Sequence, residues 1–167
     1  QLLIYVAHGG STWSKCASPD IRRFEPMPLK TDAEHLRLLT RKLFHSGFNK
    51  ALVDAKWPAF EQAFAQFDPA VVAAFDETDV TRLRANAGIV RHRLKIRATI
   101  NNARHFVEMA AVHGSWHSWL QSLRPLPYGE RERQLHHALT HCGPNTIFYF
   151  LLEAGETTVD DRPKGVK

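Results

Sequence analysis

A short basic stretch in the middle of the chain has the residue types that contact a polyanion. It begins in a turn that contains a glycine and continues after that turn. Its residues are Gly88, Ile89, Arg91, His92, Arg93 and Lys95. A tight turn between two helices points backbone N–H groups and the start of the second helix at a phosphate. Nearby basic side chains add affinity that falls with salt and does not depend on base sequence. The stretch therefore predicts a phosphate-binding hairpin, and the alternative is an ordinary helix–helix turn with a solvated basic face.

The elements that must position this hairpin are predicted to be helices. Thr31 and Glu34 have capping-box spacing, and Asp68-Pro69 combines an N-cap with proline at the first helical position. Apolar residues recur at helical spacing between such signals. Helices are expected from Thr31 to about Ser46, through 51–53, from about Leu94 to His113, from about Glu130 to His141 and from Pro144 to Gly155. Further helices are expected to begin at Trp57, Asp68, Thr78 and Ser115. In the helix that begins at Trp57, Phe60, Phe64 and Phe67 lie on one face. The sequence thus predicts an all-α helical bundle.

The composition indicates one globular domain with a basic surface. The chain has 167 residues, 44% of them hydrophobic, and a formal net charge of +5. That balance excludes a disordered chain, and the charge suits nucleic acid as a partner. We expect an irregular arm over residues 1–30, a helical domain over 31–156 and a loose polar tail over 157–167. No apolar run is long enough to cross a membrane, so a cytoplasmic protein is expected. We also expect it to be a monomer.

Cysteine and histidine residues could bind a metal, but their spacing does not favour it. Cys16 and Cys142 are not part of a CxxC motif, and we expect reduced thiols or at most one disulfide. His137 and His141 lie four residues apart on an expected helix, which is a possible metal-binding spacing. No acidic residue accompanies them at close spacing, so a solvated face is expected. The sequence therefore predicts no metal and no cofactor.

Three segments in order resemble the 3-methyladenine DNA glycosylase I family. They are Phe67-Asp68-Pro69 with Val72-Ala73-Ala74 behind it, the hairpin segment 87–96 with Asn102-Ala103-Arg104, and residues 143–146 followed by Tyr149-Phe150 and Ala154-Gly155. The resemblance covers about residues 31–160. It implies an α-helical fold with an atypical helix-hairpin-helix motif and binding to double-stranded DNA. It also implies flipping of a damaged, alkylated base into a pocket and hydrolysis of its N-glycosidic bond.

The same resemblance suggests the residues of the base pocket. Phe44, Phe48 and Tyr149 are candidates for the aromatic slot. The family's base-recognising glutamate falls on Lys42, and its pocket tryptophan falls on Lys50. The family's structural zinc motif near the C-terminus is missing here, which again predicts no metal.

Lys42 is the candidate catalytic residue, with two opposite consequences. An ammonium about 4 Å from a cationic base repels it by roughly 4 kcal/mol at an effective dielectric near 20, which predicts weak excision of 3-methyladenine. If burial lowers its pKa, the amine could instead attack the sugar C1′ and form a Schiff base. The alternative is that Lys42 points to solvent or to a phosphate. Two other hypotheses remain: a catalytically degenerate DNA-binding protein, and a helical domain with no nucleic-acid role.

Overall fold

Residues 29–166 are described by a computed structural model, and every regular element in them is helical. The α-helices are α1 (Asp32–His45), α2 (Lys50–Ala55), α3 (Trp57–Ala63), α4 (Pro69–Ala73), α5 (Glu77–Ala85), α6 (Arg93–His113), α7 (Trp116–Ser122), α8 (Tyr128–Ala138) and α9 (Pro144–Glu153), with the 3-10 turns η2 (Ala65–Phe67) and η3 (Val159–Asp161). Because no strand occurs among the described residues, the all-α prediction is confirmed there. The predicted N-terminal arm lies outside them except for its last two residues.

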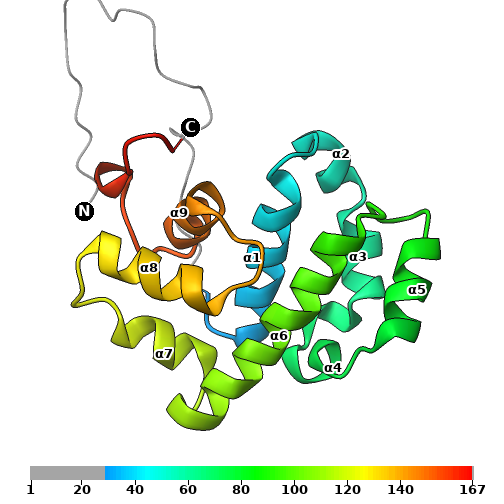
Figure 1. Ribbon diagram of the computed structural model, residues 1–167, viewed down its shortest axis with the longest axis horizontal. Coiled ribbons are helices and arrows are strands. Elements are labelled where there is room, and N and C mark those ends of the chain that lie inside the picture. Colours follow the sequence, from blue (N-terminus) through cyan, green and yellow to red (C-terminus); the bar gives the residue numbers. More distant parts are fainter. Residues whose placement is uncertain (1–28, 167) are drawn as a thin grey trace, which may run out of the picture.

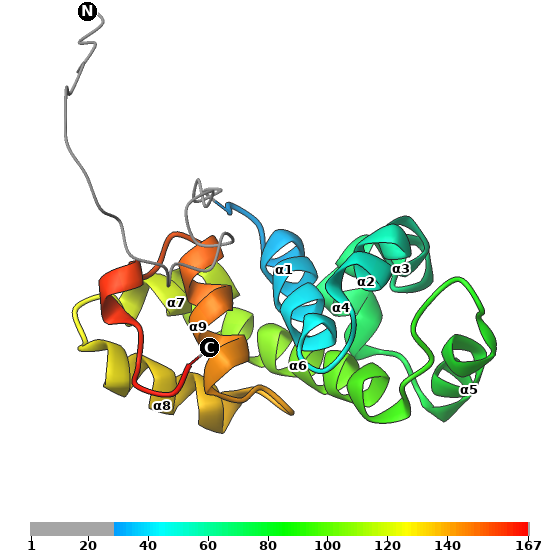
Figure 2. The same cartoon turned by 90° about the horizontal axis from the view of Figure 1, so that it is seen from above.

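Helix α6, with 21 residues, runs through the middle of the bundle, and α1 packs beside it (Figures 1 and 2). Helices α2 to α5 lie on one side of this central pair, and α7 to α9 lie on the other. The two ends of α6 therefore belong to different halves of the molecule. None of the described helices combines the length and the apolar character needed to span a membrane.

Side-chain caps start the helices close to where the sequence predicts. Thr31 and Glu34 form the expected capping box at α1. The Asp68 carboxylate accepts a hydrogen bond from the backbone N–H of Ala70 at 2.9 Å and starts α4. The expected cap at Thr78 is wrong, because Asp76 accepts hydrogen bonds from the N–H groups of Thr78 and Asp79 at 2.8 and 3.2 Å. This carboxylate starts α5 two residues earlier than predicted.

The phenylalanines after Trp57 are buried as expected, but they do not share one helix. Helix α3 ends at Ala63, and Ala65, Gln66 and Phe67 have φ values of +49°, +57° and +60°. Left-handed backbone costs roughly 1–2 kcal/mol per residue. The turn places the Phe67 ring parallel to Trp57, with 5.4 Å between ring centroids, so aromatic burial offsets that cost.

The C-terminal tail is packed, so the expectation of a loose tail is wrong. Directly before the tail, the buried Glu156 carboxylate accepts two hydrogen bonds from Arg124, at 2.7 and 2.9 Å. Val166 is 8% exposed and packs against Phe148 and Leu152 of α9. Burying these groups holds the tail against the α8–α9 side of the protein.

A buried histidine joins the start of α1 to α7. His35 is fully buried, and its Nδ1 donates to the carbonyl of Thr31 at 2.8 Å, while its Nε2 lies 3.5 Å from Nδ1 of His117. The Asp32 carboxylate accepts from the N–H groups of Trp116 and His117 at 2.9 and 3.1 Å. Burial lowers the pKa of His35, and the neighbouring His117 lowers it further.

We expect the free energy of unfolding to fall as the pH is lowered from about 7 to about 5. An unfolded histidine titrates near pH 6.5. The unfolded chain therefore takes up the His35 proton before the folded protein does, and stability present above that pH is lost below it. His45 contributes with the same sign, because burial also lowers its pKa. Urea titrations at several pH values measure the effect.

The substitution His35→Gln should flatten this pH dependence. The matched control is His136→Gln on α8, where the side chain is exposed and a substitution should leave the curve unchanged. Parallel curves for the parent and His35→Gln would show that His35 does not carry the dependence.

Candidate functional site

The segment predicted to be a phosphate-binding hairpin consists of α5, a loop over residues 86–92 and α6. Asn86 ends α5, and its Oδ1 accepts a hydrogen bond from the N–H of Gly88 at 2.8 Å. Its carbonyl accepts from the N–H of Ile89 at 3.4 Å. Lys56, at the end of α2, donates to the carbonyl of Ala87 at 2.7 Å. These contacts hold the loop in one conformation against α2 and α3.

Gly88 and Ile89 support the loop from inside. A Cβ at Gly88 would lie 3.0 Å from Cβ of Ala59 on α3 and 3.0 Å from Oδ1 of Asn86, so the residue is needed for close approach. The side chain of Ile89 is 2% exposed and belongs to the core. Ile89 can therefore offer DNA its backbone but not its side chain, and its contact with DNA stays a prediction.

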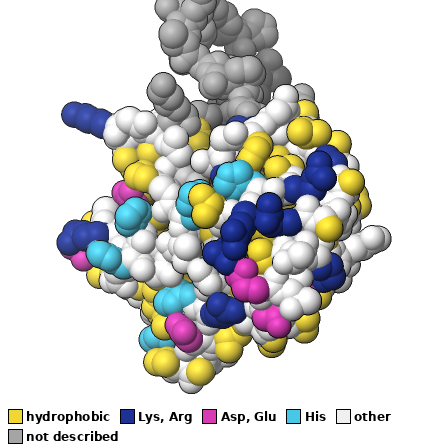
Figure 3. Space-filling model, turned by 45° about the vertical axis from the view of Figure 1, so that its right-hand side comes forward, with side chains coloured by type: hydrophobic (Ala, Val, Ile, Leu, Met, Phe, Trp, Pro, Cys, Tyr) yellow, Lys and Arg dark blue, Asp and Glu magenta, His cyan; other side chains and the backbone are white. Residues whose placement is uncertain are grey.

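Arg91 and Arg93 are exposed at the start of α6, as predicted for contacts with phosphate. Figure 3 brings the side of α2, α3 and α5 forward and shows Lys and Arg side chains gathered there. Arg93 lies 3.6 Å from Glu77, with both side chains more than half exposed, and such pairs contribute little. Arg93 can therefore exchange this partner for a phosphate.

The first turn of α6 adds backbone donors to the same surface. His92 caps the helix by accepting from the N–H of Lys95 at 3.3 Å. The N–H groups of Arg93 and Leu94 form no hydrogen bond among the residues that the structure describes. They lie at the positive end of the helix dipole, where an anion is stabilised.

Lys95 does not reach this surface, so its predicted contact with DNA is wrong. Its side chain is 6% exposed, and Nζ donates to the carbonyl of Leu43 at 2.5 Å and to the carbonyl of Ser46. Burial lowers the pKa of Lys95. The ammonium is held inside because α1 ends next to it and offers these carbonyl oxygens.

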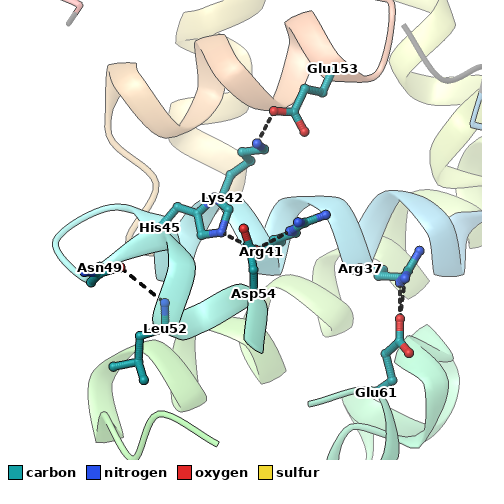
Figure 4. Close-up of polar contacts among 9 residues, drawn as sticks. All are labelled: Arg37, Arg41, Lys42, His45, Asn49, Leu52, Asp54, Glu61 and Glu153. Carbon is teal, nitrogen blue, oxygen red and sulfur yellow. Dashed lines mark hydrogen bonds and ion pairs between the residues drawn. The ribbon is translucent and has the colours of Figure 1, made fainter. Parts of the chain in front are cut away.

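The candidate catalytic residue, Lys42, is held against α9 (Figure 4). It forms an ion pair with Glu153, and the two side chains are 12% and 16% exposed. Burial lowers the pKa of Lys42, and the Glu153 carboxylate opposes that change. The alternative in which Lys42 points to solvent is therefore wrong. The assumption of an uncompensated positive charge is also wrong, because a carboxylate lies beside the ammonium.

A second polar cluster holds α2 against the last turn of α1 (Figure 4). The Asp54 carboxylate accepts from Nε of Arg41 at 2.9 Å and from Nε2 of His45 at 2.8 Å. Burial raises the pKa of Asp54, but the two hydrogen bonds outweigh it and the net pKa is lowered. Burial lowers the pKa of His45 despite this partner. The cluster positions α2 relative to Lys42.

The predicted aromatic slot is only partly assembled. Phe44 is fully buried, with its ring edge-to-face on Phe60 at 4.8 Å, so its prediction as a pocket residue is wrong. Phe48 is half-buried and faces α6. The ammonium of Lys50 lies 5.9 Å from the ring centroid of Tyr149. Tyr149 and Lys50 therefore meet where α9 faces the start of α2, next to the Lys42 pair.

Three site residues were missed from the sequence: Glu153, His45 and Asp54. Glu153 follows Tyr149 by four positions on the last helix, a spacing that puts both on one face. His45 follows Lys42 by three positions on α1 in the same way. Because both helices were predicted, these spacings could have identified Glu153 and His45 as neighbours of the candidate site residues.

His137 and His141 do not share a helical face as expected, because α8 ends at Ala138 and His141 lies beyond it with φ +62°. Both side chains are exposed, in agreement with the expected solvated position. Cys142 is a buried free thiol whose pKa burial raises to about 12. Among the described residues no three His, Cys, Asp or Glu side chains gather as metal ligands. Cys16 lies outside them, and the absence of a metal site stays a prediction.

Comparison with known proteins places this arrangement among glycosylases. Residues 26–141 match the family model described as methyladenine glycosylase. The chain is 35% identical over 106 residues to DNA-3-methyladenine glycosylase 1 of Escherichia coli (strain K12), covering 64% of this chain and 50% of that protein. It is 27% identical to DNA-3-methyladenine glycosylase of Haemophilus influenzae, covering 64% and 51%. The chain thus spans about half the length of the curated relatives it matches.

Solved structures show the same likeness. The structure of 3-methyladenine DNA glycosylase I from Staphylococcus aureus superposes with a TM-score of 0.71 at 26% identity, covering 85% of this chain and 88% of that chain. A solution structure of 3-methyladenine DNA glycosylase I gives a TM-score of 0.66 at 25% identity, covering 83% and 84%. The overall arrangement of helices is therefore shared.

Gly88→Ala should destabilise the protein by about 1–3 kcal/mol, because the added methyl group is too close to Ala59 and Asn86. The matched control is Gly129→Ala in the first turn of α8, where an added Cβ has nothing within 4 Å. Alanine also favours helix there, so the control should be neutral or slightly stabilising. Urea unfolding of both variants measures the difference. Equal stabilities would mean that the loop can move away from α3 at no cost.

Proposed function

Because the chain belongs to the methyladenine glycosylase family, we propose that it is a DNA-repair N-glycosylase. It binds double-stranded DNA as a monomer, receives a flipped base and hydrolyses the N-glycosidic bond of that base. The observation that carries the proposal is the family match over residues 26–141, which includes the hairpin and Lys42. The named relatives are 3-methyladenine glycosylases, and this supports an alkylated purine as the substrate.

The hairpin acts as a helix-hairpin-helix motif that holds the DNA backbone. Exposed Arg91 and Arg93 and the first N–H groups of α6 lie within residues 91–94, and none of them reads a base edge in this role. Lys56 and Asn86 keep the loop in place without contacting DNA themselves. Binding of this kind is independent of base sequence and sensitive to salt.

The base site is built around the ion pair between Lys42 and Glu153. Lys42 alone would repel a cationic purine, but the pair is neutral overall and contains a carboxylate. Glu153 can face the positive charge of an alkylated base or accept from its exocyclic amine, while Lys42 donates to a ring nitrogen. Tyr149 supplies an aromatic face next to them. The site therefore suits a cationic alkylated purine, and weak excision of 3-methyladenine is no longer expected.

We favour hydrolysis over amine attack because the Glu153 carboxylate stabilises the ammonium form of Lys42 and opposes the lowering of its pKa by burial. An ammonium paired with a carboxylate has no free electron pair with which to attack C1′. A cationic base leaves as a neutral molecule, so it needs no general acid. Water forms the new bond to C1′, the electrons of the N-glycosidic bond pass to the base, and the water proton is lost to solvent.

Arg91→Ala and Arg93→Ala should each weaken binding to all duplexes alike. Each removes one phosphate contact, so the slope of log affinity against log salt should decrease by about one unit. Fluorescence anisotropy with undamaged duplexes over a range of salt concentrations measures the slope. The control is Arg133→Ala on α8, a side chain 67% exposed and away from the hairpin. Unchanged affinity in the Arg91→Ala/Arg93→Ala double variant would contradict the hairpin assignment.

The parent protein should release 3-methyladenine from alkylated duplex DNA, and Glu153→Gln should slow release by about 10–100-fold. A hydrogen bond to a charged group contributes roughly 1.5–3 kcal/mol, which corresponds to this range. Single-turnover assays that quantify the released base by chromatography measure it. The control is Glu130→Gln, an exposed carboxylate on α8.

Borohydride trapping separates the two mechanisms at Lys42. Hydrolysis predicts no covalent complex with damaged DNA, whereas a complex that disappears in Lys42→Ala would establish amine attack. A parent protein that binds duplex DNA and releases no base from any alkylated substrate would favour the catalytically degenerate alternative.

A further inference from the structure

The end of α1 depends on a donor from another helix. Helix α1 ends at His45, and the last carbonyls of a helix have no partner within it. The N–H of Ser46 donates a hydrogen bond to the carbonyl of Lys42. Nζ of Lys95, whose side chain is 6% exposed, donates hydrogen bonds to the carbonyls of Leu43 and Ser46. A positive charge at this end of a helix is also favourable for the helix dipole.

The turn after α1 is joined to α6 by the same side chain. Lys95 Nζ lies 5.5 Å from the ring centroid of Phe48, a cation–π distance. The Phe48 ring also meets the ring of His92 edge-to-face at 5.5 Å, and His92 is the N-cap of α6. The residues that leave α1 therefore contact the residues that begin α6 through Phe48 and Lys95.

These contacts lie between the two functional regions of the protein. Arg91 and Arg93 precede Lys95 by four and two positions and form the phosphate-binding surface. Lys42 and His45 lie in the last turn of α1, next to the two carbonyls that Lys95 binds. A shift of α6 along α1 would change the distance between the bound phosphate and the base site.

We propose that Lys95 is a positioning residue that sets the spacing between the phosphate-binding hairpin and the base site. This inference rests on the proposed function. Burial removes the Lys95 ammonium from water, and its hydrogen bonds to the carbonyls of Leu43 and Ser46 offset that cost. Its two directional hydrogen bonds define one register of α6 against α1, and an apolar side chain would not. Lys95 acts through α1 and the hairpin, and it touches neither DNA nor the base.

The test compares Lys95→Met, which keeps the length and loses the donors, with Lys95→Arg, which keeps donors and charge. Lys95→Met should bind undamaged duplex as the parent does, while its single-turnover excision falls about 100-fold, the loss that a misplacement of about 1 Å can produce. Lys95→Arg should recover part of that rate. An equal loss of affinity and rate, or a parental rate in Lys95→Met, would overturn the proposal.

Binding alone gives a second readout that needs no chemistry. The parent should prefer a duplex with an abasic-site analogue over an undamaged duplex, because hairpin and base site engage the same nucleotide. Lys95→Met should lose this preference and keep its undamaged affinity. A preference retained in Lys95→Met would overturn the positioning role.

Failure of the proposed function can be told apart from failure of this inference. A parent that shows neither excision nor preference for the abasic analogue would contradict the proposed function. Amide hydrogen exchange then decides the role of Lys95 in the register. Faster exchange in Lys95→Met limited to residues 43–49 and 90–96 supports it, and exchange unchanged from the parent overturns it.

Discussion

At the C-terminal end of α1, the carbonyl oxygens of Leu43 and Ser46 have a donor from another helix, the buried side chain of Lys95. A buried carbonyl without a donor costs about as much as a lost hydrogen bond. Lys95 supplies two of the donors and joins α1 to the start of α6. Direct contacts consequently join the hairpin, the turn at Phe48 and the last turn of α1. Under the proposed positioning role, these contacts set the distance between the candidate phosphate site and the candidate base site.

The charge of the candidate base site is a property of a pair, and one residue alone gives the wrong sign. Taking a lysine and a glutamate out of water costs several kcal/mol per ion before their attraction is counted. Lys42 and Glu153 are both mostly buried, and the carboxylate opposes the lowering of the Lys42 pKa by burial. Removing either partner leaves an uncompensated charge between α1 and α9. The pair thus constrains how these helices pack as well as what the site can bind.

Local signals predicted the helices well because their physics is local. The side chains of Thr31 and Asp68 cap helices by accepting hydrogen bonds from backbone N–H groups two or three residues later, and the sequence alone contains that information. The burial of Lys95 was also readable, since Thr99, Asn102 and Phe106 continue its stripe on α6 and all are buried. Its basic neighbours suggested an exposed residue instead. The contact of Lys42 with Glu153 spans 111 positions, and no local pattern contains it.

The candidate base site contains a carboxylate although Lys42 stands where the family resemblance leads one to expect a glutamate. Compared position by position, Lys42 reverses the charge that the family resemblance leads one to expect on α1. In the folded protein the carboxylate beside Lys42 belongs to Glu153 of α9, and Tyr149 lies one turn before Glu153 on the same face of that helix. A base recognised by its charge responds to the field at its position, whichever helix supplies the charged group. Because α1 and α9 pack together, a carboxylate can move from one helix to the other while the field at the base site is retained.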